Sequence, residues 1–323
     1  MCGIDRFRSR ILPLALAGVI LSGCSASANL ADVAGMQGKP VLRSDQFQAG
    51  AANSGTLVAV GANGVIVSSG DGGKEWKRHV VDANASLIDL AVCPDGGFVA
   101  LDFARRVWVA DAAAGGWTAR EIGSDATPLA VTCDGKGHYW VVGSESTILS
   151  SADRGLTWNE ISHGEDLMFT TIQFIDELRG VVTGEFGTFL TTQDGGASWQ
   201  PGTPIPNDFY PYSALFADAD TGWVSGLAGT ILHTRDGGAS WERQGNPTGA
   251  PMYGLFRHDG GMFAVGANGL LLKLSGSEWA PVEGPAAPYI RTGFSLAQRG
   301  ILVAGGGGVV EIVAGNAVSG EPK

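Results

Sequence analysis

One stretch of eight residues, Thr192-Gln-Asp-Gly-Gly-Ala-Ser-Trp199, decides the fold because close copies of it recur along the chain. The other copies span residues 69–76, 151–158 and 234–241, and all four share Asp at the third position, Gly at the fifth and Trp at the eighth. Such an aspartate can accept hydrogen bonds from turn amides, the glycine can take a backbone angle closed to other residues, and the tryptophan can pack as an anchor. We therefore expect these positions to be structural. They are Asp71, Trp76, Asp153, Trp158, Asp194, Trp199, Asp236 and Trp241.

The tryptophans mark a longer repeat. They stand at Trp76, Trp117, Trp158, Trp199, Trp241 and Trp279, at spacings of 41, 41, 41, 42 and 38 residues. A period near 40 to 45 residues is typical of one four-stranded blade of a β-propeller. Between the second and third expected strands lies a turn that most clearly reads Gly-x-x-Gly, as in Gly226-Leu-Ala-Gly229. Because glycine supplies the positive φ that tight hairpins need, this pattern indicates a strand connection.

The repeat count gives the architecture. Residues 39–323 number 285, enough for about seven units, so we predict an all-β, seven-bladed propeller with Asp-box (BNR) repeats, as the eight-residue motif is called. In the last unit the tryptophan column falls on Gly320, so that blade lacks its outer strand. We expect the segment Pro40-Val-Leu-Arg-Ser-Asp-Gln-Phe47 to add to this blade and close the ring as an N-terminal strand.

The N-terminus carries a targeting signal. Three arginines precede an apolar stretch, residues 11–23, that is too short to span a bilayer, and Leu21-Ser-Gly-Cys24 resembles a bacterial lipobox. Residues 1–23 are predicted to be a lipoprotein signal peptide, Cys24 the lipidation site, and residues 24–38 a flexible tether to the propeller. Ser25 follows the cysteine, which in Gram-negative lipoproteins favours the periplasmic face of the outer membrane.

Charge argues against one class of partner. The sequence carries a formal charge of -11, and because phosphate backbones attract basic surfaces, we do not expect nucleic-acid binding.

The segment 214–241, which contains Asp218-Ala-Asp-Thr-Gly-Trp223 and the fourth motif copy, resembles a blade of the photosystem II stability/assembly factor-like propellers. The resemblance covers about residues 40–315. It implies a seven-bladed propeller that binds partners and has no known catalytic chemistry. Photosynthetic members have an arginine-rich face, whereas arginine is sparse here and the chain is acidic.

Catalytic signals are weak. Asp-boxes also occur in sialidases, but the Arg-Ile-Pro mark of that family is absent and no carboxylate pair stands out. No histidines or cysteines pair at metal-ligand spacing, so we expect neither metal nor cofactor and no enzymatic activity. A carbohydrate-binding or sialidase-like propeller remains the alternative. Cys93 and Cys133 follow inner strands of adjacent blades, and a disulfide and two buried thiols are both open readings.

Aromatic residues gather where outer strands return to inner ones. In propellers these connections ring one mouth of the central channel, and aromatic and arginine side chains favour protein contacts. We therefore expect a non-enzymatic scaffold that assists the assembly, stability or transport of an envelope membrane complex; packing between blades is the alternative role for these side chains. The candidate partner-binding residues are Phe169, Tyr210, Tyr212, Tyr253, Tyr289 and Arg291.

Overall fold

The computed structural model of the chain describes residues 38–207 and 209–315. The predicted signal peptide, Cys24 and all but the last residue of the predicted tether lie outside the described residues.

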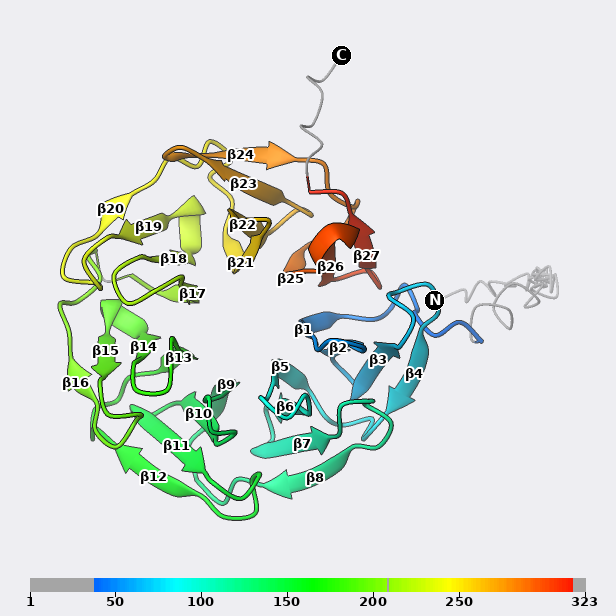
Figure 1. Cartoon of the computed structure of the whole chain (residues 1–323), viewed down its shortest axis with the longest axis horizontal. Coiled ribbons are helices and arrows are strands. Elements are labelled where there is room, and N and C mark those ends of the chain that lie inside the picture. The colour runs from blue at the N-terminus through cyan, green and yellow to red at the C-terminus, as the bar shows by residue number, and fades with distance from the viewer. Residues whose placement is uncertain (1–37, 208, 316–323) are drawn as a thin grey trace, which may run out of the picture. The chain divides into compact units, whose positions relative to one another are not determined.

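Seven antiparallel sheets stand around a central channel in the described propeller unit (Figure 1). Six sheets have four strands and the last has three. In each sheet the strands follow chain order, so that β1, β5, β9, β13, β17, β21 and β25 lie nearest the channel. The prediction of an all-β, seven-bladed propeller is confirmed.

Blades 1 to 4 contain the following strands: β1 Phe47–Ala52, β2 Leu57–Gly61, β3 Val65–Ser69, β4 Lys77–Val80; β5 Leu87–Val92, β6 Phe98–Asp102, β7 Arg106–Ala110, β8 Thr118–Glu121; β9 Pro128–Cys133, β10 Tyr139–Gly143, β11 Thr147–Ser151, β12 Asn159–Ser162; β13 Phe169–Phe174, β14 Gly180–Gly184, β15 Phe189–Thr192, β16 Gln200–Pro201. Blades 5 to 7 contain β17 Pro211–Phe216, β18 Gly222–Gly226, β19 Ile231–Thr234, β20 Glu242–Arg243; β21 Met252–His258, β22 Gly261–Gly266, β23 Leu271–Ser275, β24 Glu278–Val282; β25 Ile290–Ser295, β26 Ile301–Gly305, β27 Val310–Val313. Short 3₁₀ turns span Glu185–Gly187, Leu227–Gly229 and Ala297–Arg299.

Hydrophobicity changes across each blade in step with burial. The second strand is apolar along its length, and all five residues of β2 are buried. The outer strand is polar, and three of the four residues of β4 are exposed. A strand that is apolar on both faces must be covered on both sides, which here happens because each blade packs against two neighbours.

The hydrophobic core therefore lies between blades. Seven clusters of buried side chains occur in the described chain, and each combines residues of two adjacent blades. Trp199 of blade 4 meets Trp140 of blade 3 with ring centroids 6.2 Å apart, and Trp241 of blade 5 meets Phe189 of blade 4 at 5.9 Å. The repeated tryptophan thus anchors one blade to the blade before it.

The ring closes differently from the predicted strand addition. Phe47 begins β1, the inner strand of blade 1, so the preceding residues only span the seam between blades 7 and 1. They do so through an isolated bridge between Gln46 and Gly306 and a hydrogen bond from the Gly308 N–H to the Asp45 carbonyl (2.9 Å). The Asp45 carboxylate also pairs with Arg78 of blade 1 at 2.7 Å. The connection between blades 1 and 2 has the same contacts. There the Gly64 N–H donates to the Ala85 carbonyl, and Ala62 forms an isolated bridge with Ser86.

Cys93 and Cys133 form a disulfide, which resolves the open alternative in favour of the bridge. Their Cα atoms are 5.2 Å apart and 40 residues separate them in sequence. The bridge joins the ends of the inner strands of blades 2 and 3, inside the cluster that these blades share. It is therefore a covalent fastening of one interface of the ring.

Candidate functional site at the channel mouth

The central channel contains a cavity of about 340 Å³. All seven inner strands line it with three consecutive residues each, from Gln48–Gly50 in blade 1 to Arg291–Gly293 in blade 7. Most of these residues are small or aliphatic. The large polar groups that line it come chiefly from blades 5 to 7, which is where the predicted partner-binding residues other than Phe169 lie.

Four tyrosines form a continuous row at this mouth. The ring centroids of Tyr210 and Tyr212 are 5.6 Å apart, those of Tyr212 and Tyr253 are 5.5 Å apart, and those of Tyr253 and Tyr289 are 6.5 Å apart, all with edge-to-face geometry. All four side chains are half-buried. Because edge-to-face contacts hold each ring against the next, the row presents an ordered aromatic surface to solvent.

Arg291 stands over this row. Its guanidinium carbon lies 5.9 Å from the ring centroid of Tyr212 and 5.5 Å from that of Tyr253, both within cation–π range. Burial lowers the pKa of Arg291, while attraction from Asp89 acts in the opposite direction. An arginine remains protonated at neutral pH, so the mouth carries a sheltered positive charge among aromatic rings.

Asp89 is a site residue that the sequence reasoning missed. It comes from inner strand β5 of blade 2 and lines the same cavity as Arg291. Burial raises the pKa of Asp89, and hydrogen bonds from the N–H groups of Val131 (2.8 Å) and Leu90 (2.9 Å) act against this rise. The sequence does show an acidic residue, Asp89, on an expected inner strand. No spacing pattern, however, predicts that it lies near Arg291, which is five blades later in the chain.

Tyr289 also belongs to the seam of the ring. Its hydroxyl donates to the Gln46 side-chain oxygen (2.9 Å) and accepts from the Gln48 side-chain amide (3.0 Å). Burial raises the pKa of this tyrosine, so it stays protonated at neutral pH. These contacts bind blade 7 to the start of blade 1 and fix one end of the aromatic row.

Phe169 does not belong to this surface. Its ring is 1% exposed and packs in the cluster between blades 3 and 4, so the expectation that it contacts a partner is wrong. The residue stands at the start of β13, where the side chain alternates toward the blade interface rather than the mouth. The position of Phe169 in the sequence did not reveal whether its side chain points toward the blade interface or toward the mouth.

Three exposed apolar side chains lie on the same side of the ring as the mouth. Phe103, Phe186 and Leu227 are 52%, 63% and 49% exposed and stand at the tips of turns between second and third strands. These turns lie on the same side of the ring as the mouth because they bond to the connections that lead into it; the Gly187 N–H, for example, donates to the Phe209 carbonyl at 2.8 Å. The opposite side also has exposed apolar side chains, Leu156 at 69% and Leu178 at 55%, so exposure alone does not single out the mouth.

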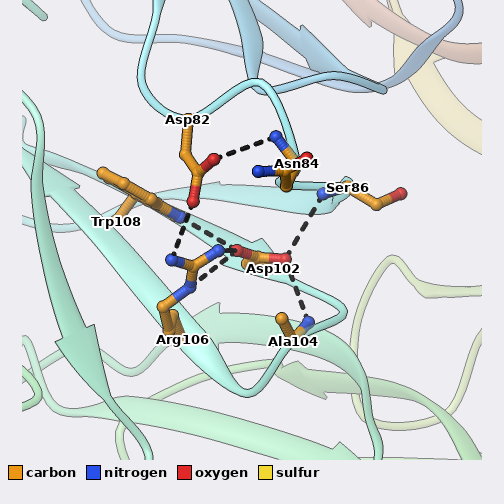
Figure 2. Close-up of polar contacts among 7 residues, drawn as sticks. All are labelled: Asp82, Asn84, Ser86, Asp102, Ala104, Arg106 and Trp108. Carbon is orange, nitrogen blue, oxygen red and sulfur yellow. Dashed lines mark hydrogen bonds and ion pairs between the residues drawn. The ribbon is translucent and has the colours of Figure 1, made fainter.

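An ionic network centred on the buried Asp102 holds the turn between β6 and β7, and Figure 2 shows its hydrogen bonds. The same turn carries Phe103. Asp102, fully buried, stands where blade 1 has Gly61, and it accepts hydrogen bonds from Arg106 (2.9 and 2.6 Å) and from the Trp108 indole (3.3 Å). Arg106 also pairs with Asp82 at 3.1 Å. A charge buried in this way requires its partners, so the network fixes the turn where glycine does so elsewhere.

The opposite side of the ring carries the Asp-box turns, whose contacts are local. Asp194 accepts from the N–H and hydroxyl of Ser198 (2.9 and 2.7 Å) and from the Thr192 hydroxyl (2.8 Å), and Gly196 has φ of +87°. Hydrogen bonds from Ser198 and Thr192 lower the pKa of Asp194 to about 2. In the other three copies of the motif, the Ser or Thr hydroxyl at the first position likewise donates to the aspartate, which is Asp71, Asp153 or Asp236. The geometry supports the structural assignment of these residues.

Among the described residues, no group of three His, Cys, Asp or Glu side chains is arranged to hold a metal ion. Within the same part of the chain, none of the helical segments has the length and apolar character needed to cross a membrane.

A family model described as "Photosynthesis system II assembly factor YCF48" matches this chain in two overlapping segments, residues 109–201 and 163–254. A curated relative, the photosystem II assembly lipoprotein Ycf48 of Synechococcus sp. (strain CC9902), is 29% identical over 106 residues. That match covers 31% of this chain and 32% of the relative, so the chain spans about a third of the relative's length in this alignment.

Solved structures share the fold at low sequence identity. YCF48 from Cyanidioschyzon merolae has a TM-score of 0.68 and 15% identity, covering 84% of this chain and 95% of that one. A structure of YCF48 bound to D1 peptide has a TM-score of 0.68 and 14% identity, with 84% and 92% covered. Virginiamycin B lyase from Staphylococcus aureus has a TM-score of 0.70 and 12% identity, with 82% and 94% covered.

Proposed function

We propose that this chain, which resembles the photosystem II assembly factor-like propellers with Asp-box repeats, is a non-enzymatic protein-binding scaffold that assists the assembly, stability or transport of a membrane complex of the cell envelope. The observation that carries this proposal is the ordered row of Tyr210, Tyr212, Tyr253 and Tyr289 with Arg291 at the channel mouth. Tyrosine and arginine are the residues that most often dominate binding energy at protein interfaces. Rigid rings also lose little side-chain entropy when a partner binds.

The relatives support a protein ligand. One is named as a photosystem II assembly lipoprotein and another was solved with a D1 peptide, so propellers of this kind accept polypeptide segments. The proposed partner of this chain is an envelope protein or membrane complex. The formal charge of -11 favours a partner with a basic surface, since opposite charges speed encounter and select against acidic competitors.

The channel chemistry argues for binding rather than catalysis. A sialidase-like site would need three arginines around the substrate carboxylate, and among the described residues that line the channel Arg291 is the single arginine. The lyase that shares the fold is 12% identical, a likeness of fold that carries no activity to this chain.

We place the protein on the periplasmic face of the outer membrane through a lipid on Cys24. Cys24→Ala should release the protein from membranes, because one acylated cysteine is the proposed anchor. Fractionation with mass spectrometry measures this. A variant that still sediments with membranes and retains acyl mass contradicts the proposal.

The docking face is tested by paired substitution. Tyr212→Ala combined with Tyr253→Ala should abolish recovery of the envelope complex by affinity purification, with little change in melting temperature, because both rings are half-exposed. Arg235→Ala in the Asp-box turn of blade 5 is the matched control, since Arg235 lies on the opposite side in an exposed pair with Glu242. Equal recovery from both variants, or loss of complex only together with unfolding, would assign the tyrosines to packing.

A further inference from the structure

Blade 7 ends in an open sheet edge. In the other six blades an outer strand pairs with the third strand, whereas within residues 38–207 and 209–315 no strand pairs with the outer side of β27. The residues ahead of β1, predicted to fill this place, instead span the seam with blade 1. An unpaired edge offers a row of backbone donors and acceptors to any extended chain of suitable sequence.

The other blades identify which groups of β27 face outward. The residue that starts the third strand after the Gly-x-x-Gly turn presents its carbonyl to the outer strand: the Phe189 carbonyl accepts from Gly202 (2.8 Å), and the Ile231 carbonyl accepts from Gln244 (2.9 Å). Val310 occupies this position in blade 7. Alternate residues of a strand direct their backbone hydrogen bonds to the same side. The backbone N–H and C=O groups of Val310 and Ile312 therefore face outward, and those of Glu311 and Val313 bond to β26.

A groove lies between β27 and the connection that leads from blade 6 to blade 7. It has a volume of about 270 Å³ and is lined by residues 283–285, from the connection between blades 6 and 7, and by Glu311 and residues 313–315. Blade 4 has a smaller cavity between the connection that contains His163 and the start of strand β15. There the outer strand itself, at Pro201, forms part of the wall. In the described chain the groove on blade 7 has no outer strand in its wall, and it borders β27 through Glu311 and Val313.

The chemistry of the groove indicates its occupant. Glu283 and Glu311 are both exposed and line it, and no cationic side chain is among its lining residues in the described chain. Ile312 on the edge strand is 41% exposed. The sequence that follows, Asn316-Ala-Val-Ser-Gly-Glu-Pro-Lys323, has no tryptophan anchor and contains glycine and proline, which weaken strands.

We propose that the edge of β27 binds an extended segment of a partner protein that carries lysine or arginine, and that this segment adds as the fourth strand of blade 7. Backbone hydrogen bonds from Val310 and Ile312 supply the pairing, and Glu283 and Glu311 select basic side chains. This surface is on the rim of the ring and is distinct from the aromatic row at the mouth. A partner can therefore use it whether or not the mouth is a docking site.

The test uses a fluorescent seven-residue peptide of alternating lysine and valine, read by anisotropy against the full chain. We expect saturable binding that is lost when alternate peptide amides are N-methylated, because methylation removes ladder donors. Ile312→Pro should abolish binding, since it removes an outward N–H that β26 does not use. Glu283→Lys with Glu311→Lys should weaken binding about tenfold or more while leaving the backbone intact. Tyr212→Ala with Tyr253→Ala should bind as the unaltered chain does, which separates this surface from the mouth.

Two results overturn the proposal. Binding that is insensitive to both N-methylation and charge reversal means that the peptide does not add to this edge. Binding that appears only when the chain is ended after Gly315 means that residues 316–323 are themselves the fourth strand. Hydrogen exchange provides the second measurement: the Ile312 amide should exchange fast in the free chain and become protected with the peptide, and protection without peptide counts against an open edge.

Discussion

The two sides of the ring are built on opposite rules. On the Asp-box side the same hydrogen bonds recur in blades 1, 3, 4 and 5, each closed within a few residues. At the mouth the aromatic row belongs to blades 5 to 7, and Arg291 has a counter-charge in Asp89 of blade 2. A feature that recurs in four of the seven blades serves a need that those blades share, which is folding. The aromatic row occurs in three neighbouring blades, so folding of the blades does not explain it, and we assign it to binding. This contrast separates structural from functional residues although the chain has no catalytic motif.

The largest effect should come from removing an Asp-box anchor. Trp199 is 5% exposed and contacts Trp140 and Phe174, so Trp199→Ala leaves a large cavity between blades 3 and 4. We expect a loss of about 3 to 5 kcal/mol in the free energy of unfolding, measured by denaturant titration. If the variant kept its stability but lost its partner, the assignment of the two sides would have to be reversed.

The disulfide is expected to rank next. Cys93→Ser with Cys133→Ser opens a link across 40 residues and should lower stability by about 2 to 4 kcal/mol. The loss should match that caused by reducing the unaltered chain, which is the control. Unchanged unfolding after either treatment would mean that the cluster between blades 2 and 3 holds without the bridge.

Acid should act on the Asp-box side through its aspartates. The pKa of Asp194 is about 2 in the folded chain and near 4 when unfolded, so the ionised group stabilises the fold above pH 4, and this contribution is lost as pH falls toward 2. Asp194→Ala should therefore lower the melting temperature at pH 7, with the difference shrinking between pH 4 and 2. A difference that stays constant over this range would show that the turn depends on packing instead of the carboxylate.

The smallest effect on stability is expected at the mouth. Tyr212→Ala removes a half-exposed ring whose contacts are Tyr210, Tyr253 and Arg291, and should change the free energy of unfolding by about 1 kcal/mol or less. Thermal unfolding beside Trp199→Ala gives the comparison directly. A loss as large as that of the tryptophan would make the aromatic row part of the core.

The fold was predictable because its information is periodic. Trp76, Trp117 and their successors fix blade length, and the Gly-x-x-Gly turns fix the hairpins, so the ring follows from counting. The loop tyrosines do lie together at the mouth, while their role in binding a partner stays a prediction. Phe169 was placed wrongly, because one position along a strand decides between the core and the channel. The proximity of Asp89 to Arg291 escaped prediction for a different reason, as only closure of the ring brings blade 2 and blade 7 to one cavity.

The seam between blades 7 and 1 has a consequence for how the molecule is made. Phe47 and Leu57 of blade 1 share a cluster with Leu296 and Leu302 of blade 7, although about 250 residues of chain separate them. A nascent chain presents the blade 1 half of that cluster first and must wait for the last blade to cover it. Folding is therefore expected to be slow and of high contact order, with one apolar surface exposed until the final residues emerge. During that interval the first blade is the part of the molecule most in need of protection from aggregation.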